Sequence, residues 1–260
     1  MGSVIRKPAG IKPQSALHNP PMTLEQILFS QGFGTRKMCR LLIADGAVTI
    51  GGEPCCDPAA QWDLDNGDGA PFLFAVEGAT WQYHAKAYLV LNKPAGYECS
   101  QKSKAHPSVY TLLPSPLRTR DVQSVGRLDH DTTGLLLFSD DGQFIHKMAS
   151  PKHHVPKVYE VTTAEPVTDK QIASLIAGVV LDDSPIPVLA LGCERVTPTH
   201  LKLTLAQGKY HQVKRMLAAV GNHVNALHRS QVGKFVLPVE LALGEWRFLT
   251  GEELMLASGS

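Results

Sequence analysis

The sequence lacks the features that would indicate a membrane-spanning, secreted or zinc-binding protein. No apolar run approaches the roughly 18 residues needed to cross a bilayer, and the N-terminal segment has no hydrophobic stretch of the kind found in signal peptides. The five cysteines include no CxxC pair, so the usual spacing of zinc ligands is absent. We therefore expect a soluble, cytoplasmic protein with reduced thiols, no bound metal and no membrane partner.

Acidic residues are missing from two long windows of a chain that is almost neutral overall. The 260 residues carry a formal net charge of +1. No Asp or Glu occurs between Glu194 and Glu240, or from Gly142 to Tyr159, and both windows contain several Lys, Arg and His residues. Such windows indicate a localised binding site for a polyanion, although two solvated surfaces would produce the same pattern.

The N-terminal part of the chain is expected to contain a disordered extension and a small domain. Residues 1–21 are rich in Pro and Lys and contain no acidic residue, so we expect them to be disordered. The small domain is expected over residues 22–80, where Thr23 and Thr35 each precede a short helical pattern as N-caps. The apolar face of the second helix is expected to comprise Met38, Leu41, Leu42 and Ile43.

The segment 34–53 (GTRKMCRLLIADGAVTIGGE) predicts a helix, a strand at 48–50, a glycine turn and a further strand. This order resembles the core of an S4 RNA-binding domain. The resemblance implies that RNA phosphates are bound by the second helix through Arg36, Lys37 and Arg40. From Thr23 to Thr80 there are three basic and eight acidic residues, a net charge of −5, so we expect RNA contact to be restricted to one helix face.

A linker is expected at residues 81–86 and a second, larger domain at 87–256. Strands outnumber helices there without regular βαβ alternation, which predicts an α+β fold built on a mixed, largely antiparallel sheet. The strands are expected at 88–92, 135–139, 158–162, 188–191 and 201–205, and the helices at 142–149, 169–176 and 212–220.

Asp129 lies in a segment, 126–138 (GRLDHDTTGLLLF), that joins a cation and a carboxylate to a turn and a buried strand. Residues 132–134 are typical of a turn and residues 135–138 of a fully buried strand. Arg127 is close enough in sequence to keep the carboxylate ionised. Asp129 is therefore a candidate nucleophile or electrostatic stabiliser, and an ordinary turn or capping residue is the alternative interpretation.

Four motifs, in order along the chain, resemble those of pseudouridine synthases. The segment 125–142 resembles the family's catalytic motif, and 91–97 (LNKPAGY) its early structural motif. The segment 157–159 (KVY) resembles its tyrosine motif, and 207–217 (QGKYHQVKRML) its basic motif. The stretches 150–154 and 208–228 are most similar to the RsuA branch, which acts on 16S ribosomal RNA.

The resemblance implies an enzyme that isomerises uridine in RNA without a cofactor. Asp129 would be the nucleophile, and its target on the ribose or on the base stays open. Arg127 would fill or support the position vacated by a flipped-out base, and Tyr159 would stack on the uracil. Either Lys214 or Arg215 would pair with Asp129, because neighbouring helical side chains point about 100° apart and only one should face it.

The resemblance also implies that Lys209 and His211 bind RNA. The partner would be ribosomal RNA or a small-subunit assembly intermediate, and the protein would act as a monomer. One alternative is a catalytically silent RNA-binding or ribosome-assembly protein with the same fold. Another is a metal-dependent hydrolase using Asp129, His130 and Asp131, although adjacent side chains on an extended segment point apart.

Overall fold

The computed structural model describes residues 20–64, 70–182 and 184–259, and these form two units. The smaller unit extends to Tyr83, and the larger unit comprises residues 31–33 together with the chain from His84 onward. The expected disordered extension, residues 1–21, lies outside the described residues except for its last two positions. Among the helices of the described ranges, none is long and apolar enough to cross a membrane.

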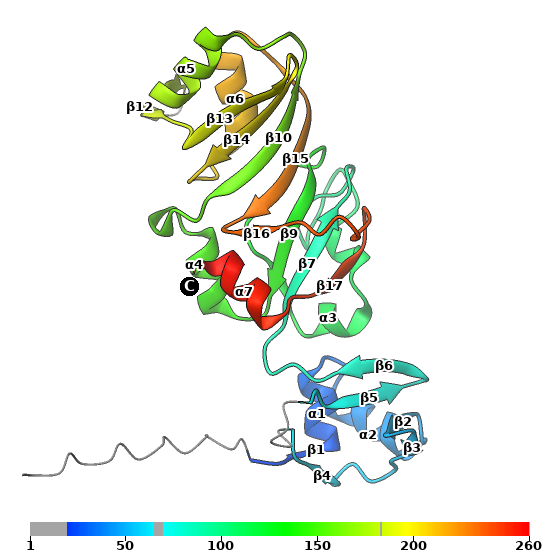
Figure 1. The fold of residues 1–260 in the computed structure, drawn as a ribbon. Coiled ribbons are helices and arrows are strands. Elements are labelled where there is room, and N and C mark those ends of the chain that lie inside the picture. The colour runs from blue at the N-terminus through cyan, green and yellow to red at the C-terminus, as the bar shows by residue number, and fades with distance from the viewer. Residues whose placement is uncertain (1–19, 65–69, 183, 260) are drawn as a thin grey trace, which may run out of the picture. The chain divides into compact units, whose positions relative to one another are not determined.

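The smaller unit contains two short helices and a four-stranded antiparallel sheet of order β3-β2-β5-β6 (Figure 1). The expected N-cap at Thr23 is confirmed and forms a capping box with Gln26, since Thr23 N donates to Gln26 Oε1 and Gln26 N donates to Thr23 Oγ1. Thr35 caps the second helix by accepting from Met38 N. The elements are β1 (Met22–Thr23), α1 (Leu24–Ser30), α2 (Arg36–Ala44), β2 (Val48–Ile50), β3 (Glu53–Pro54), β4 (Gln61–Trp62), β5 (Leu73–Val76) and β6 (Ala79–Gln82).

Two expectations for this unit are wrong. The apolar face predicted for α2 is misplaced, because Met38 and Leu41 are each 53% exposed while Cys39 and Ile43 are buried. The reason is that this short helix buries only one narrow stripe of its surface. The linker expected at 81–86 begins inside β6, which pairs with β5 along its whole length.

The larger unit is built on a nine-stranded mixed sheet whose main order is β13-β14-β10-β15-β9-β7-β17. Every pairing in it is antiparallel except that between β9 and β15, so the predicted fold class is confirmed. Its strands are β7 (Tyr88–Lys93), β8 (Gln123–Ser124), β9 (Thr133–Ser139), β10 (Lys157–Thr163), β13 (Gly192–Thr197), β14 (His200–Leu205), β15 (Val224–Val232), β16 (Phe235–Val236) and β17 (Trp246–Phe248). A separate hairpin is formed by β11 (Val179–Leu181) and β12 (Ser184–Val188).

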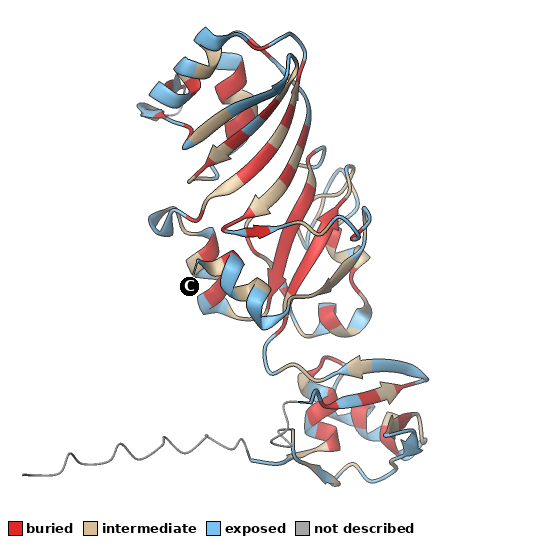
Figure 2. Cartoon of the chain, in the orientation of Figure 1, coloured by how far each residue is buried: buried red, intermediate tan, exposed pale blue. Residues whose placement is uncertain are grey.

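Helices cover both faces of this sheet, so its central strands are buried on both sides (Figure 2). Leu136 and Phe138 of β9 point into one core with α3, α5 and α6, whereas Leu135 and Leu137 point into the other with α4 and α7. The helices are η1 (Val109–Leu112), α3 (Ser115–Thr119), α4 (Gly142–Ala149), η2 (Pro151–His153), α5 (Asp169–Ala177), α6 (Gln212–Ala219) and α7 (Gly251–Ser258).

The observed strands of this unit differ from the expected ones in several places. The strand predicted at 188–191 is wrong, because β12 ends at Val188 and the next residues are irregular. The long strand β15 and the short strand β17 were not predicted at all. β9 begins at Thr133, so residues expected in a turn already belong to the sheet.

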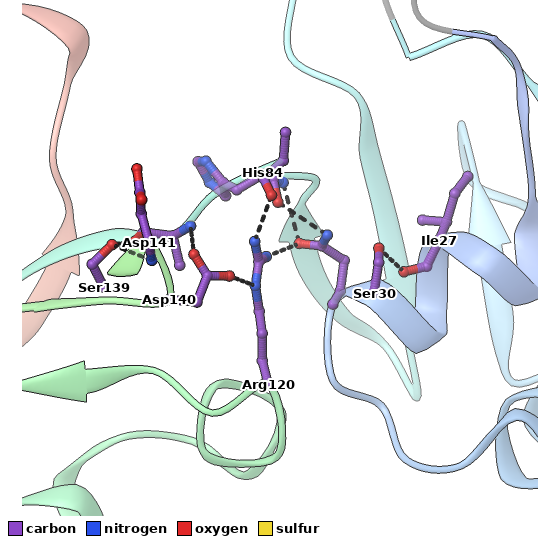
Figure 3. Close-up of polar contacts among 10 residues, drawn as sticks. Ile27, Ser30, His84, Arg120, Ser139, Asp140 and Asp141 are labelled. Carbon is purple, nitrogen blue, oxygen red and sulfur yellow. Dashed lines mark hydrogen bonds and ion pairs between the residues drawn. The ribbon is translucent and has the colours of Figure 1, made fainter. Parts of the chain in front are cut away.

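A half-buried ion pair stabilises the edge of the larger unit (Figure 3). Arg120 Nε lies 2.6 Å from Asp140 Oδ2, and the same guanidinium donates to Gln31 Oε1 and to the Ala85 carbonyl. Asp140 also accepts from Ala87 N at the entry to β7. This network ties the chain before β7 to the end of β9 and therefore helps to fix the two strands that carry the site.

Candidate active site

The loop that carries Asp129 runs from β8 to β9 and is held against β15 by a glycine. Gly134 has φ +105°, and a Cβ there would lie 2.4 Å from the Arg229 carbonyl oxygen. Gly134 is paired with Arg229 in the parallel contact between β9 and β15. Only glycine permits this approach of the two backbones, so this residue determines where the loop enters the sheet.

Lys93 is fully buried at the end of β7 and binds the backbone of the Asp129 loop. Its Nζ donates to the carbonyl oxygens of Pro94 (3.0 Å), Asp129 (3.1 Å), His130 (3.2 Å) and Thr132 (2.8 Å). Burial lowers the pKa of Lys93, while nearby acidic groups, including the two aspartates of the loop, act in the opposite direction. A buried ammonium must be compensated by hydrogen bonds, and here three of its four acceptors belong to the loop.

A histidine and a lysine lie at the Asp129 carboxylate. His211 Nε2 is 3.4 Å from Oδ1, and Lys214 Nζ is 3.6 Å from Oδ2. Lys214 is closer still to Asp131, with 2.7 and 2.8 Å to its two oxygens. Burial raises the pKa of Asp131, but the hydrogen bond and charge of Lys214 outweigh it, and the net shift is downward. Lys214 is therefore shared between two carboxylates.

Of the other residues predicted for the site, some line the same pocket as Asp129 and one does not face it. Arg127, Tyr159 and Lys209 line the same pocket as Asp129, which we call the Asp129 pocket. Tyr159 is buried in β10, between β14 and β15. Arg215 Nη1 donates to the Tyr210 carbonyl at 3.3 Å, whereas Lys214 faces Asp129. Within the described chain, the ion pairs of Asp129 are with His211 and Lys214, and the pairing first inferred for Arg127 is not made.

The side chains next to Asp129 in sequence have partners of their own. The His130 ring stacks on His106 with centroids 4.3 Å apart and planes inclined by 7°. Asp131 is held by Lys214 as described above. The two residues that the hydrolase alternative requires as metal ligands are thus directed to an aromatic ring and an ammonium group.

The three cations predicted on α2 of the smaller unit divide into a paired set and an exposed lysine. Arg36 and Arg40 both form ion pairs with Glu25 of α1, and Arg36 also lies over the Phe29 ring at 4.6 Å. Hydrogen bonding from Arg40 makes the largest contribution to lowering the pKa of Glu25. Lys37 is exposed. More than half of each arginine side chain remains exposed, so both can still reach an anion.

Two residues at the site were not assigned their roles by sequence reasoning. Lys93 was placed in a structural motif without a role of its own. A lone lysine at the end of an apolar strand is the sequence feature that could have indicated its buried position. His211 was expected to bind RNA, and its distance to Asp129 depends on tertiary structure that a local pattern does not contain.

These features define a class of protein: an α+β domain with a carboxylate set among cations in a pocket that also contains a tyrosine. The chain belongs to the RNA pseudouridylate synthase family, whose model matches residues 87–219. The family predicted from the four motifs is therefore confirmed, and the protein is an RNA pseudouridine synthase.

Similar proteins span almost the whole chain. Ribosomal small subunit pseudouridine synthase A of Escherichia coli K12 is 46% identical over 236 residues, which cover 90% of this chain and 98% of that protein. The protein of the same name from Haemophilus influenzae is 38% identical over 233 residues, with 90% and 98% covered. A crystal structure of a pseudouridylate synthase superposes with a TM-score of 0.63 at 36% identity, covering 91% of this chain and 99% of that chain.

Proposed function

We propose that this enzyme isomerises a specific uridine of small-subunit ribosomal RNA to pseudouridine, with Asp129 as the nucleophile. The substrate class follows the names of the similar proteins from E. coli and H. influenzae. The observation that carries the catalytic assignment is the Asp129 carboxylate, which faces the Asp129 pocket with the His211 ring near one of its oxygens and the Lys214 ammonium near the other.

The reaction needs a stabilised carboxylate but no external reactant. The bond between N1 of uracil and C1′ of ribose breaks, a bond between C5 and C1′ forms, C5 loses a proton and N1 gains one. The atoms of the product equal those of the substrate, so no cofactor is required. Cleavage of the glycosidic bond develops positive charge on the sugar, which a fixed carboxylate stabilises or captures. Asp129 supplies that carboxylate in this proposal.

The target base must leave the RNA stack to reach the pocket, at a cost of a few kcal/mol. A wider cleft beside the Asp129 pocket is lined by residues 98–100, 126–130 and 208–211. We assign to Arg127 the support of the vacated position, because it lines both the Asp129 pocket and this cleft. We assign to Tyr159 stacking on the flipped uracil, a contact that contributes about 1–3 kcal/mol per base. Its position on the pocket wall next to Asp129 supports this role.

Flanking RNA is bound by cations around the cleft and on the smaller unit in this proposal. Lys209 lines both the pocket and the cleft. In the S4-like unit, Arg36, Lys37 and Arg40 share α2 and provide a second, weaker contact. We further propose that the protein acts as a cytoplasmic monomer on ribosomal RNA or on an assembly intermediate, since one chain supplies every residue assigned above.

The substrate assignment is tested by mapping pseudouridine in ribosomal RNA from cells that lack the protein. We expect one small-subunit position to lose its pseudouridine, wild-type protein to restore it, and Asp129→Asn to leave it unmodified. A complete pseudouridine pattern in the deletion strain would contradict the proposed substrate. If the deletion strain has a ribosome-assembly defect that Asp129→Asn rescues fully, the catalytically silent alternative would be favoured.

A further inference from the structure

His211 has a backbone conformation that residues other than glycine rarely adopt. It is the N-cap of α6 with φ +47° and ψ +33°, in the left-handed region. Asn, Asp and His tolerate this region better than most residues, yet it remains unfavourable for any side chain with a Cβ. Strained residues of this kind persist where surrounding structure enforces them, and they are concentrated at functional sites.

The residues around His211 hold both its backbone and its ring. Lys209 N donates to Gln212 Oε1 at 2.8 Å across the turn, and Arg215 N donates to the His211 carbonyl at 3.0 Å in the first turn of α6. The Tyr210 ring stacks on the imidazole with centroids 3.8 Å apart and planes inclined by 17°. The ring is therefore fixed in the direction that places Nε2 at the Asp129 carboxylate.

We propose that His211 is a positioning residue for the nucleophile, a role that rests on the proposed function of Asp129. Its Nε2 lies 3.4 Å from Asp129 Oδ1 and Lys214 Nζ lies 3.6 Å from Oδ2, so in this proposal the two together fix the plane of the carboxylate. Both the imidazolium and the neutral tautomer with hydrogen on Nε2 can make this contact. Because Lys214 is shared with Asp131, it restrains Asp129 less than its charge alone suggests.

This role differs in its kinetics from the phosphate contact first expected of His211. Loss of a phosphate contact weakens RNA binding and raises KM, with little change in kcat. Loss of a positioning contact lowers kcat, because a displacement of about 1 Å in a reacting group can cost about 10²-fold in rate. The two interpretations are thus separated by which constant changes.

The test is His211→Gly with chemical rescue by imidazole. Glycine adopts φ +47° without strain, so the variant keeps the backbone while removing the ring. We expect kcat for tritium release from RNA labelled at uracil C5 to fall by about 10²-fold with little change in KM. The melting temperature should be unchanged or raised, and added imidazole should restore at least part of the lost kcat.

A matched control is available in Asp121, an exposed residue with φ +64° outside the residues that line the pocket and the cleft. Asp121→Gly removes a similar backbone strain and should leave kcat unchanged. If His211→Gly does not fold, His211→Asn provides the measurement, since asparagine also accepts the left-handed region but is too short to keep the contact.

An unchanged kcat, or a rise in KM alone, would overturn the positioning role and leave His211 as an RNA contact. A fall in kcat that imidazole does not restore, combined with a lowered melting temperature, would also overturn it, because the role would then be structural. Wild-type protein is measured alongside. If wild type releases no tritium, the proposed function fails, and that outcome is distinct from failure of the role of His211.

Discussion

Replacing Lys93 by methionine tests whether the buried ammonium group of this lysine positions the backbone of the Asp129 loop. Methionine has a similar length and stays apolar, so the change removes four hydrogen bonds with little change in packing. The acceptors are the carbonyl oxygens of Pro94, Asp129, His130 and Thr132. The substitution therefore releases the backbone on both sides of the nucleophile.

The cost in stability follows from which carbonyls keep another donor. The Asp129 oxygen still accepts from Thr132 N, and the His130 oxygen from Gly96 N. The carbonyls of Pro94 and Thr132 lose their ammonium donor, and the buried Thr132 carbonyl left without a donor costs about 1–3 kcal/mol. The half-buried Pro94 carbonyl adds a smaller cost, and the sum is partly offset because no ammonium group is buried any longer. We expect a net loss of about 1–3 kcal/mol in the free energy of unfolding.

The loss of activity should exceed what this change in stability produces. A displaced nucleophile is expected to lower kcat by about 10²-fold even where the variant is fully folded. Thermal unfolding and tritium release, both measured well below the melting temperature, separate the two effects. The exposed Lys102→Met is the control and should change neither quantity. A Lys93→Met variant with wild-type kcat would refute the inference that this lysine positions the loop.

Three further predictions concern the strand contact, the smaller unit and a second buried lysine. Gly134→Ala should lower stability by about 2–5 kcal/mol in chemical unfolding, because its Cβ would meet the Arg229 backbone; a loss below 1 kcal/mol would show that the strands separate easily. Glu25→Gln should tighten RNA binding by about 2–10-fold at low salt by freeing the two arginines that it holds, and an unchanged affinity would argue against α2 as an RNA-binding face. Burial, with repulsion from Arg229, lowers the pKa of Lys157 from 10.5 to about 8, so between these values the unfolded chain binds the proton and the folded protein does not. Unfolding at several pH values should show wild type gaining about 1–3 kcal/mol relative to Lys157→Met from pH 7.5 to 10, and a constant difference would contradict the shift.

Local signals predicted most of the helices, because a cap acts within one turn, although α7 was not predicted despite its Thr250 cap. The Thr23 capping box, the Thr35 cap and the bounds of α4 are all encoded within a few neighbouring residues. The long strand β15 has a different origin. Its sequence alternates irregularly between polar and apolar residues, and it is stabilised by pairing with β10 and β9, which are far away in the chain.

The sequence predicted which residues form the candidate site better than it predicted the contacts between them. The motifs indicated Asp129, Tyr159 and Lys214, and the structure brings all three to one pocket region. The contact between His211 and Asp129 joins residues more than eighty positions apart and depends on a strained backbone. The sharing of Lys214 between two carboxylates likewise exists only in the folded domain.

The central claim, that Asp129 is the nucleophile, is tested most directly by tritium release from RNA labelled at uracil C5. Purified wild type, Asp129→Asn and Asp131→Asn are compared under single-turnover conditions. Asp131 is the matched control, since it binds the same lysine from the same loop. We expect release by wild type, release within about 10-fold of wild type by Asp131→Asn, and none by Asp129→Asn. Release by Asp129→Asn at the wild-type rate, or loss confined to Asp131→Asn, would contradict the account.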